Sequence, residues 1–181
     1  VFDPGRKKLL VGSDVTSKYS RRTEEEYLHI ARYIYEIVKN RYGNYMIFFP
    51  SHIFLQKIYD IFMEYFAEGQ KIDCIVQEDR MDERSREEFL QQFGADEGEA
   101  ERTLLGFCVL GGIFSEGIDL KKDSLIGAII VGTGLPQVCN EREILKKYFD
   151  EEGNHGFDYA YRYPGMNKVL QAAGRVIRTD E

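Results

Sequence analysis

Residues 103–110 read TLLGFCVL, an apolar run with a charged segment before it and two glycines after it. A continuous apolar run of this length is typical of a strand that is buried on both faces of a parallel sheet. Further runs of this kind occur at 8–14 (KLLVGSD), 44–49 (NYMIFF), 72–77 (IDCIVQ) and 125–131 (LIGAIIV). The five runs predict the strands of one mainly parallel sheet.

Helical segments alternate with these runs. Their apolar residues recur at spacings of three and four, which predicts helices that pack by one face. Three of the segments begin with a residue that can cap a helix N-terminus, namely Thr23, Asp82 and Asn140. The expected helices are 23–40, 53–66, one after Asp82, one after Asn140 and one from Pro164 to about Arg178. Strands that alternate with helices predict an α/β fold of the doubly wound type.

The composition sets limits on the class of protein. The chain has 181 residues, of which 43% are hydrophobic, so it can form one compact domain. No apolar run reaches the roughly 18 residues of a membrane-spanning helix, and the N-terminus lacks the order of a signal peptide. We therefore expect a soluble, cytoplasmic protein without a membrane partner. The chain lacks an initial Met and stops soon after its last helix, so we expect residues 1–181 to be one domain of a larger protein.

The three cysteines and three histidines of the chain do not cluster. Cys74, Cys108 and Cys139 lie far apart and form no Cys-x-x-Cys pair. This spacing favours free thiols over a disulfide framework or a metal site.

Charge is unevenly distributed along the chain. The net charge is -7, and thirteen acidic residues face only four basic ones between Glu64 and Glu101. The first 22 residues are basic, with six Lys and Arg against two Asp. Because nucleic-acid phosphates are bound by local positive potential, the N-terminal segment is the stretch best suited by charge to contact them.

The last expected helix carries a polar stripe. At 100° per residue, Gln171, Arg175 and Arg178 fall within 60° of one another. The larger apolar residues of this helix, among them Met166 and Leu170, fall on the opposite side and are expected to pack on the sheet. A Gln/Arg stripe is either a plain solvent-exposed surface or a site for an anionic ligand.

Three segments resemble the conserved motifs of one enzyme family. Residues 171–178 (QAAGRVIR) resemble the Q-x-x-G-R-x-x-R motif VI of superfamily-2 helicases, in the form found in the XPD/DinG family. Residues 112–119 (GIFSEGID) resemble motif V of that family, and 46–52 (MIFFPSH) resemble its motif IV. The resemblance spans nearly the whole chain and implies a second, C-terminal RecA-like domain. Such a domain has a doubly wound, mainly parallel sheet with helices on both faces, here truncated at its C-terminal end.

The resemblance also implies roles for individual residues. Arg175 and Arg178 would be catalytic arginine fingers, which supply positive charge to the γ-phosphate of ATP as it is transferred. Nucleotide binding would involve Gln171, Glu116, Gly117, Asp119 and Gly174. Contacts to nucleic acid would come from Ser51, His52 and Ser115. For both serines the alternative is a helix N-cap.

The chain lacks part of an ATP site. It contains no G-x-x-x-x-G-K-[ST] phosphate loop, so ATP and Mg²⁺ would be held mainly by an N-terminal motor domain of the same protein. The resemblance implies an ATP-dependent DNA helicase that acts on single-stranded DNA. This chain alone would then be inactive, and it would hold no metal.

Two other functions compete with this interpretation. Residues 125–134 (LIGAIIVGTG) form an apolar run that leads into G-x-G, as in dinucleotide-binding folds, but Gln137 replaces the third glycine. The second alternative is a catalytically inactive RecA-like scaffold that serves protein contacts.

Overall fold

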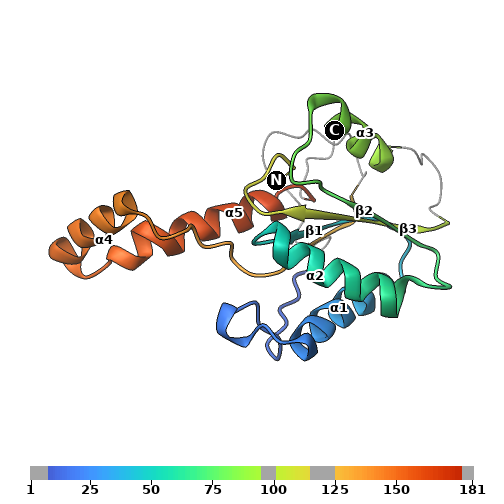
Figure 1. Ribbon diagram of the computed structural model, residues 1–181, viewed down its shortest axis with the longest axis horizontal. Coiled ribbons are helices and arrows are strands. Elements are labelled where there is room, and N and C mark those ends of the chain that lie inside the picture. The colour runs from blue at the N-terminus through green and yellow to red at the C-terminus, as the bar shows by residue number, and fades with distance from the viewer. Residues whose placement is uncertain (1–7, 95–100, 115–124, 177–181) are drawn as a thin grey trace.

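The computed structural model describes residues 8–94, 101–114 and 125–176 of the chain. Its centre is a parallel sheet of four strands in the order β2-β3-β1-β4 (Figure 1). The strands are β1 (Gly43–Phe49), β2 (Ile72–Val76), β3 (Thr103–Val109) and β4 (Gly127–Ile130). Four of the five predicted strands are therefore confirmed, and so is the parallel α/β architecture.

The predicted strand at 8–14 is wrong. This segment pairs with no strand of the sheet, and Leu9 and Val11 are 77% and 82% exposed. An apolar run becomes a strand only when a neighbouring strand takes up its backbone hydrogen bonds. The segment lies instead beside α1 (Glu24–Val38), where a Cβ on Gly12 would stand 3.4 Å from the Tyr33 ring and Tyr33 Oη donates to the Asp14 carboxylate.

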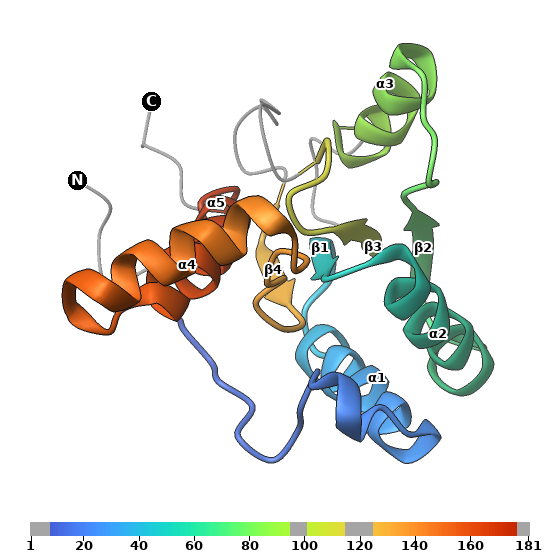
Figure 2. The ribbon, with the colours of Figure 1, turned by 60° about the vertical axis from the view of Figure 1, so that its left-hand side comes forward.

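Helices cover both faces of the sheet, as predicted (Figure 2). On one face, α1 (Glu24–Val38) and α2 (His52–Phe62) pack over β1 and β3, and a π-helical turn, η3 (Met63–Ala67), follows α2. The stacked rings of Phe49 and Phe107 lie in this core, with centroids 5.9 Å apart. The other face carries α3 (Glu83–Gln91), the short helix η4 (Gln92–Gly94) and α5 (Tyr163–Ala173).

Two of the predicted helix caps are confirmed. The Thr23 hydroxyl accepts from the backbone N–H of Glu26 at 3.2 Å, and Asp82 Oδ1 accepts from that of Ser85 at 2.8 Å. The Asn140 cap is wrong, because α4 (Asn140–Gly153) already includes Asn140 and has Cys139 at its N-cap position without a side-chain bond.

The segment from α4 to α5 forms an arm that projects from the sheet (Figure 1). A second π-helical turn, η5 (Asp158–Arg162), links the two helices and holds α4 in place. Tyr161 Oη donates to Glu143 Oε1 at 2.5 Å, and this bond raises the pKa of Tyr161 to about 12. Arg142 Nη1 donates to the Ala160 carbonyl at 2.7 Å. In the described ranges no helix combines the length and apolar character needed to cross a membrane.

Candidate functional site

The candidate site lies at the carboxyl edge of the sheet. Because all four strands run parallel, the loops that follow them emerge at this one edge, where ligands bind in open α/β sheets. The loops begin with Pro50 after β1, Gln77 after β2, Leu110 after β3 and Val131 after β4. The motif IV segment begins in β1 and the motif V segment begins just after β3, and these two strands pair directly with each other.

Ser51 caps α2. Its hydroxyl accepts from the backbone N–H of Phe54 at 3.3 Å, and its backbone is extended, as an N-cap requires. The alternative role given to this serine, a helix cap, is therefore confirmed. A nucleic-acid contact by the same residue stays a prediction.

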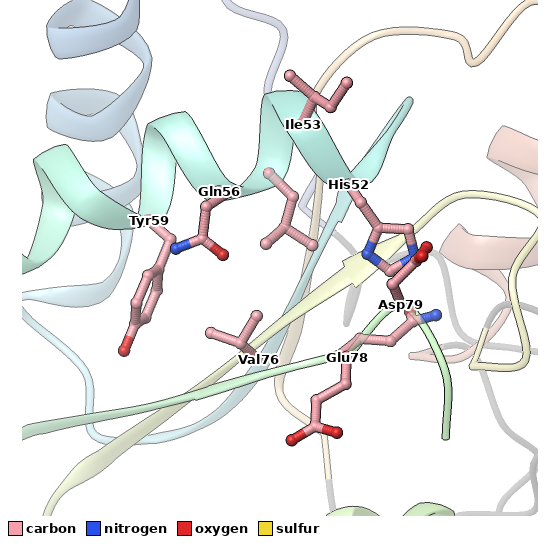
Figure 3. Close-up of a pocket in the computed structure, with 9 residues that line it drawn as sticks. His52, Ile53, Gln56, Tyr59, Val76, Glu78 and Asp79 are labelled. Atoms are coloured by element: carbon pink, nitrogen blue, oxygen red, sulfur yellow. The ribbon is translucent and has the colours of Figure 1, made fainter. Parts of the chain in front are cut away.

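His52 faces an acidic neighbour. Its Nε2 lies 3.5 Å from Oδ1 of Asp79, which follows β2 (Figure 3). One third of the His52 side chain is exposed, and Asp79 is 82% exposed. The histidine is thus accessible to a ligand at the carboxyl edge, where Asp79 adds negative charge.

A groove of about 550 Å³ runs between α2 and the end of β2. His52 and Asp79 lie at one end and Tyr59 at the other, while the Glu78 carboxylate points away from His52 (Figure 3). Its floor is largely apolar, and Val76 contributes to it. The groove has one polar end next to the motif IV residues and no cluster of catalytic groups.

The start of the motif V segment is held by a neighbouring strand. The Gln77 side chain is buried, and its Oε1 accepts from the backbone N–H of Val109 at 2.9 Å. The N–H of Gly112 in turn donates to the Val109 carbonyl at 3.2 Å. A Cβ on Gly112 would lie 3.0 Å from the Val109 carbonyl oxygen and 3.1 Å from Gln77 Nε2, so a side chain here would have to displace the buried Gln77 slightly.

Four predicted site residues of motif V lie outside the described residues. They are Ser115, Glu116, Gly117 and Asp119. Their assigned roles stay predictions.

The helix predicted from Pro164 to about Arg178 ends earlier, because α5 stops at Ala173 inside motif VI and Gly174 and Arg175 follow it in a turn. Gln171 and Gly174 are exposed and Arg175 is half-buried, whereas Arg178 lies outside the described residues. Pro164 occupies the first turn, as predicted. The polar stripe thus begins on an accessible surface at Gln171.

The predicted packing face of α5 is wrong. Gly165 and Ala172 are the buried residues of the helix, while Leu170 is 63% exposed and Met166 is 39% exposed. A Cβ on Gly165 would lie 3.1 Å from the Thr133 carbonyl oxygen, so the helix approaches the loop after β4 through a residue without a side chain. Close approach requires small residues, and this requirement outweighs the larger apolar area of leucine and methionine.

One cationic residue of α5 was missed by sequence reasoning. Lys168 lies against Gly111, the second residue after β3, and a Cβ on Gly111 would stand 2.9 Å from Lys168 Cε and 3.3 Å from Nζ. Lys168 is three residues before Gln171 and seven before Arg175, so it extends the same stripe. This helical spacing is the sequence signal by which Lys168 could have been predicted as a site residue.

The glycines after β4 do not form a dinucleotide loop. Gly132 and Gly134 have φ of 86° and 55°, but residues 135–139 continue without helical structure and α4 begins only at Asn140. A dinucleotide fold needs a helix N-terminus directly after the glycines to receive the pyrophosphate. The geometry contradicts that alternative.

No group of three or more His, Cys, Asp or Glu side chains converges as metal ligands within 8–94, 101–114 and 125–176. In the same ranges Cys74 is half-buried, Cys108 is buried and Cys139 is exposed, each as a free thiol.

Comparison with known proteins identifies relatives along almost the whole chain. The sequence model of a family described as "Helicase C-terminal domain" matches residues 34–181. The ATP-dependent DNA helicase XPD of Sulfolobus acidocaldarius is 26% identical over 179 residues, which cover 96% of this chain and 29% of that protein. The ATP-dependent DNA helicase CHL1 of Debaryomyces hansenii is 24% identical over 145 residues, which cover 77% of this chain and 18% of that protein.

The fold has solved counterparts as well. A structure titled XPD helicase superposes with a TM-score of 0.66 at 24% identity, over 92% of this chain and 28% of that structure's chain. At this identity the likeness shows the fold alone. The chain thus spans less than a third of the length of each of these relatives.

Proposed function

Because this chain belongs to the helicase C-terminal domain family, we propose that it is the second motor domain of an XPD-like, ATP-dependent DNA helicase. In this proposal the whole protein is a cytoplasmic enzyme that translocates on single-stranded DNA while it hydrolyses ATP. The observation that carries the proposal is the position of the motif VI helix beside the loop that opens motif V. Lys168, three residues before motif VI, lies on Gly111, the residue before motif V, which supports a site shared by the two motifs at one edge of the sheet.

The motif VI arginines would act on ATP held by the first motor domain. Negative charge develops on the γ-phosphate and its leaving oxygen during hydrolysis, and cations that are already in place stabilise it. Arg175 lies two residues beyond the end of α5 at Ala173, and Arg178 follows it three residues later in the sequence. A guanidinium can donate two parallel hydrogen bonds to phosphate oxygens, which supports a role as arginine fingers.

The remaining nucleotide contacts would surround these arginines. Gln171 is exposed one turn before Arg175 and can orient it or the phosphate, and Gly174 leaves space for a close approach. In motif V, Glu116 and Asp119 would accept hydrogen bonds from the ribose or the arginines, next to Gly117. Mg²⁺ would reach the site with the nucleotide and the first motor domain.

DNA would contact the carboxyl edge at motifs IV and V. His52 is accessible there, Ser51 is adjacent to it, and Ser115 follows β3 in the sequence. Phosphate contacts by histidine and by serine hydroxyls carry no sequence information, which suits an enzyme that moves along a strand.

A catalytically inactive scaffold is the second candidate, and the projecting arm favours it. Ile144 and Tyr148 lie one turn apart on α4 and are 70% and 56% exposed, and Val138, two residues before α4, is 76% exposed. Large exposed apolar side chains on a projecting arm are typical of a protein contact surface. The two candidates differ in whether the motif VI arginines act on ATP.

The test is ATP turnover of the intact protein against single-stranded DNA concentration, with Arg175→Ala and Arg178→Ala compared with wild type. We expect turnover to fall by roughly 10³ to 10⁵ in either variant, the range for arginine fingers, at an unchanged melting temperature. Replacement of either arginine by Lys should restore little ATP turnover, because the ammonium point charge cannot make the two parallel hydrogen bonds of the planar guanidinium group. Arg84→Ala is the matched control, since this arginine on α3 is 86% exposed and pairs only with Glu88 among the described residues. Near-normal turnover in both motif VI variants, or a loss explained by unfolding, would favour the scaffold.

A further inference from the structure

We infer that Lys168 and Lys18 bind backbone phosphates of single-stranded nucleic acid, one on each side of Ser51 and His52. The inference rests on the proposed function and adds two residues to it. The positions concerned are the carboxyl ends of three adjacent strands, β3, β1 and β4.

The first position is the end of β3. Gly111 has φ of 69°, and the aliphatic chain of Lys168 lies across it, with Cε 2.9 Å from where a Cβ would stand. Lys168 forms no ion pair with any carboxylate of the described residues. β3 is the direct neighbour of β1, and Phe49 pairs with Val109 at the ends of the two strands. The Lys168 ammonium group therefore lies by the strand end next to the one that leads into Ser51.

The opposite position is the end of β4. The turn before α1 lies there, because a Cβ on Gly132 would collide with the Ser17 side chain. Arg22 links this turn to α2. Its Nε donates to the Ser17 carbonyl at 3.1 Å, and its guanidinium group lies 4.2 Å from the centroid of the Phe54 ring in the first turn of α2. The exposed Lys18 directly follows Ser17. The backbone directly before Lys18 is thereby held between the end of β4 and the first turn of α2.

The sheet order puts these positions in a row. β3, β1 and β4 are consecutive neighbours in the sheet, so the strand ends that lead to Gly111 under Lys168, to Ser51 and His52, and to Gly132 beside Ser17 follow one another in this order. Neighbouring strands are about 4.8 Å apart, so the three strand ends span about 10 Å. β2, on the far side of β3, leads into Glu78 and Asp79, and the Asp79 carboxylate reaches to within 3.5 Å of His52 Nε2. Because this carboxylate would repel phosphate near His52, the positive charge for a phosphate contact must come from the two lysines on either side.

The neighbouring side chains favour a single strand as the ligand. Tyr19 follows Lys18 in the short helix η2 (Tyr19–Arg21), and its ring is 84% exposed, as a surface on which an unpaired base can stack. Arg21 is not included in the row, because it lies 4.0 Å from the Glu26 carboxylate. On a chain with a net charge of -7, binding of a polyanion depends on such local cations.

The test uses the intact protein with Lys168→Met, Lys18→Met and the double variant. Methionine keeps the length of the lysine stem and removes the charge, and Lys168→Arg restores it. Fluorescence anisotropy with labelled oligo-dT, without nucleotide, gives the dissociation constant as a function of salt. We expect each Met variant to bind several-fold more weakly, with a salt slope smaller by about 0.7, the value for one phosphate contact on a single strand. The KM for ATP at saturating DNA should stay unchanged.

Lys147→Met is the matched control, because Lys147 on α4 is 80% exposed and lies away from this edge. Unchanged DNA affinity and salt slope in both variants would overturn the inference, and so would a raised KM for ATP in Lys168→Met with DNA binding intact. If either of these results is found while the wild type binds DNA and Arg175→Ala abolishes ATP turnover, only the role of the two lysines is refuted and the proposed function stands. If the wild type shows neither DNA binding nor DNA-dependent ATP turnover, the proposed function fails together with it.

Discussion

Phe93 rests directly on Gly106. A Cβ on Gly106 would stand 2.5 Å from Cζ of the Phe93 ring, which is closer than two carbon atoms can approach. Gly106 lies in the middle of β3, paired with Met46 of β1 and Ile75 of β2, and Phe93 is 2% exposed. The glycine within the run TLLGFCVL therefore makes room for the aromatic ring that closes this face of the sheet.

Replacement of Gly106 by Ala should destabilise the domain. The added methyl group would force the Phe93 ring out of place, and overpacking of this kind costs about 1–3 kcal/mol. The free energy of unfolding from urea titration, followed by circular dichroism, measures the effect. Gly94→Ala is the control, because a Cβ on Gly94 meets no atom within 4 Å. Equal stability of the two variants would show that the Phe93 ring moves without cost.

One thiol of the native chain should react quickly with an aromatic disulfide reagent. Cys139 is exposed, whereas burial raises the pKa of Cys74 to about 12 and that of Cys108 further still. At pH 8 the Cys74 thiolate is then about 10⁻⁴ of the total, and only the thiolate is nucleophilic. We expect one rapid equivalent from the native protein and three after unfolding, by absorbance of the released thiol. A Cys139→Ser variant that still releases one rapid equivalent would contradict this assignment.

The 181-residue chain alone should not hydrolyse ATP. Its dissociation constant for ATP should be about millimolar or weaker, which is a binding free energy of about 4 kcal/mol or less. Phosphate affinity in such enzymes comes mainly from a glycine-rich loop and Mg²⁺, and this sequence contains no such loop. Titration calorimetry and a steady-state ATPase assay measure the two quantities. Turnover near one per second by the purified chain would refute the assignment to a second motor domain.

Variants of motif V should uncouple ATP turnover from DNA. If this segment links the nucleotide to the strand, Glu116→Gln and Asp119→Asn in the intact protein weaken the stimulation of turnover by single-stranded DNA. ATPase rate against DNA concentration measures this, with thermal melting as the folding control. Glu151→Gln on α4 is the matched exchange, since Glu151 is 69% exposed. Normal stimulation in both motif V variants would remove this segment from the proposed coupling.

Local features of the fold could be predicted from the sequence because their causes are local. The runs that became β1 and β3 are apolar on both sides, and such runs pair in the interior of a parallel sheet. Thr23 and Asp82 cap helices because each hydroxyl or carboxylate bonds an N–H three residues later. The run at 8–14 failed as a strand because no strand of the sheet takes up its backbone hydrogen bonds, although its residues are apolar.

The sequence alone determined the α/β class, the helix starts at Thr23 and Asp82, and the motif resemblance that names Arg175 and Ser51 as candidates. Only the tertiary structure decided which side of α5 is buried, since that depends on how closely Gly165 can approach the loop after β4. It also decided that Lys168 lies on Gly111, although the two residues are far apart in the chain. The physical reason is that strand order and helix approach arise from packing between distant segments, which no local pattern of residues encodes.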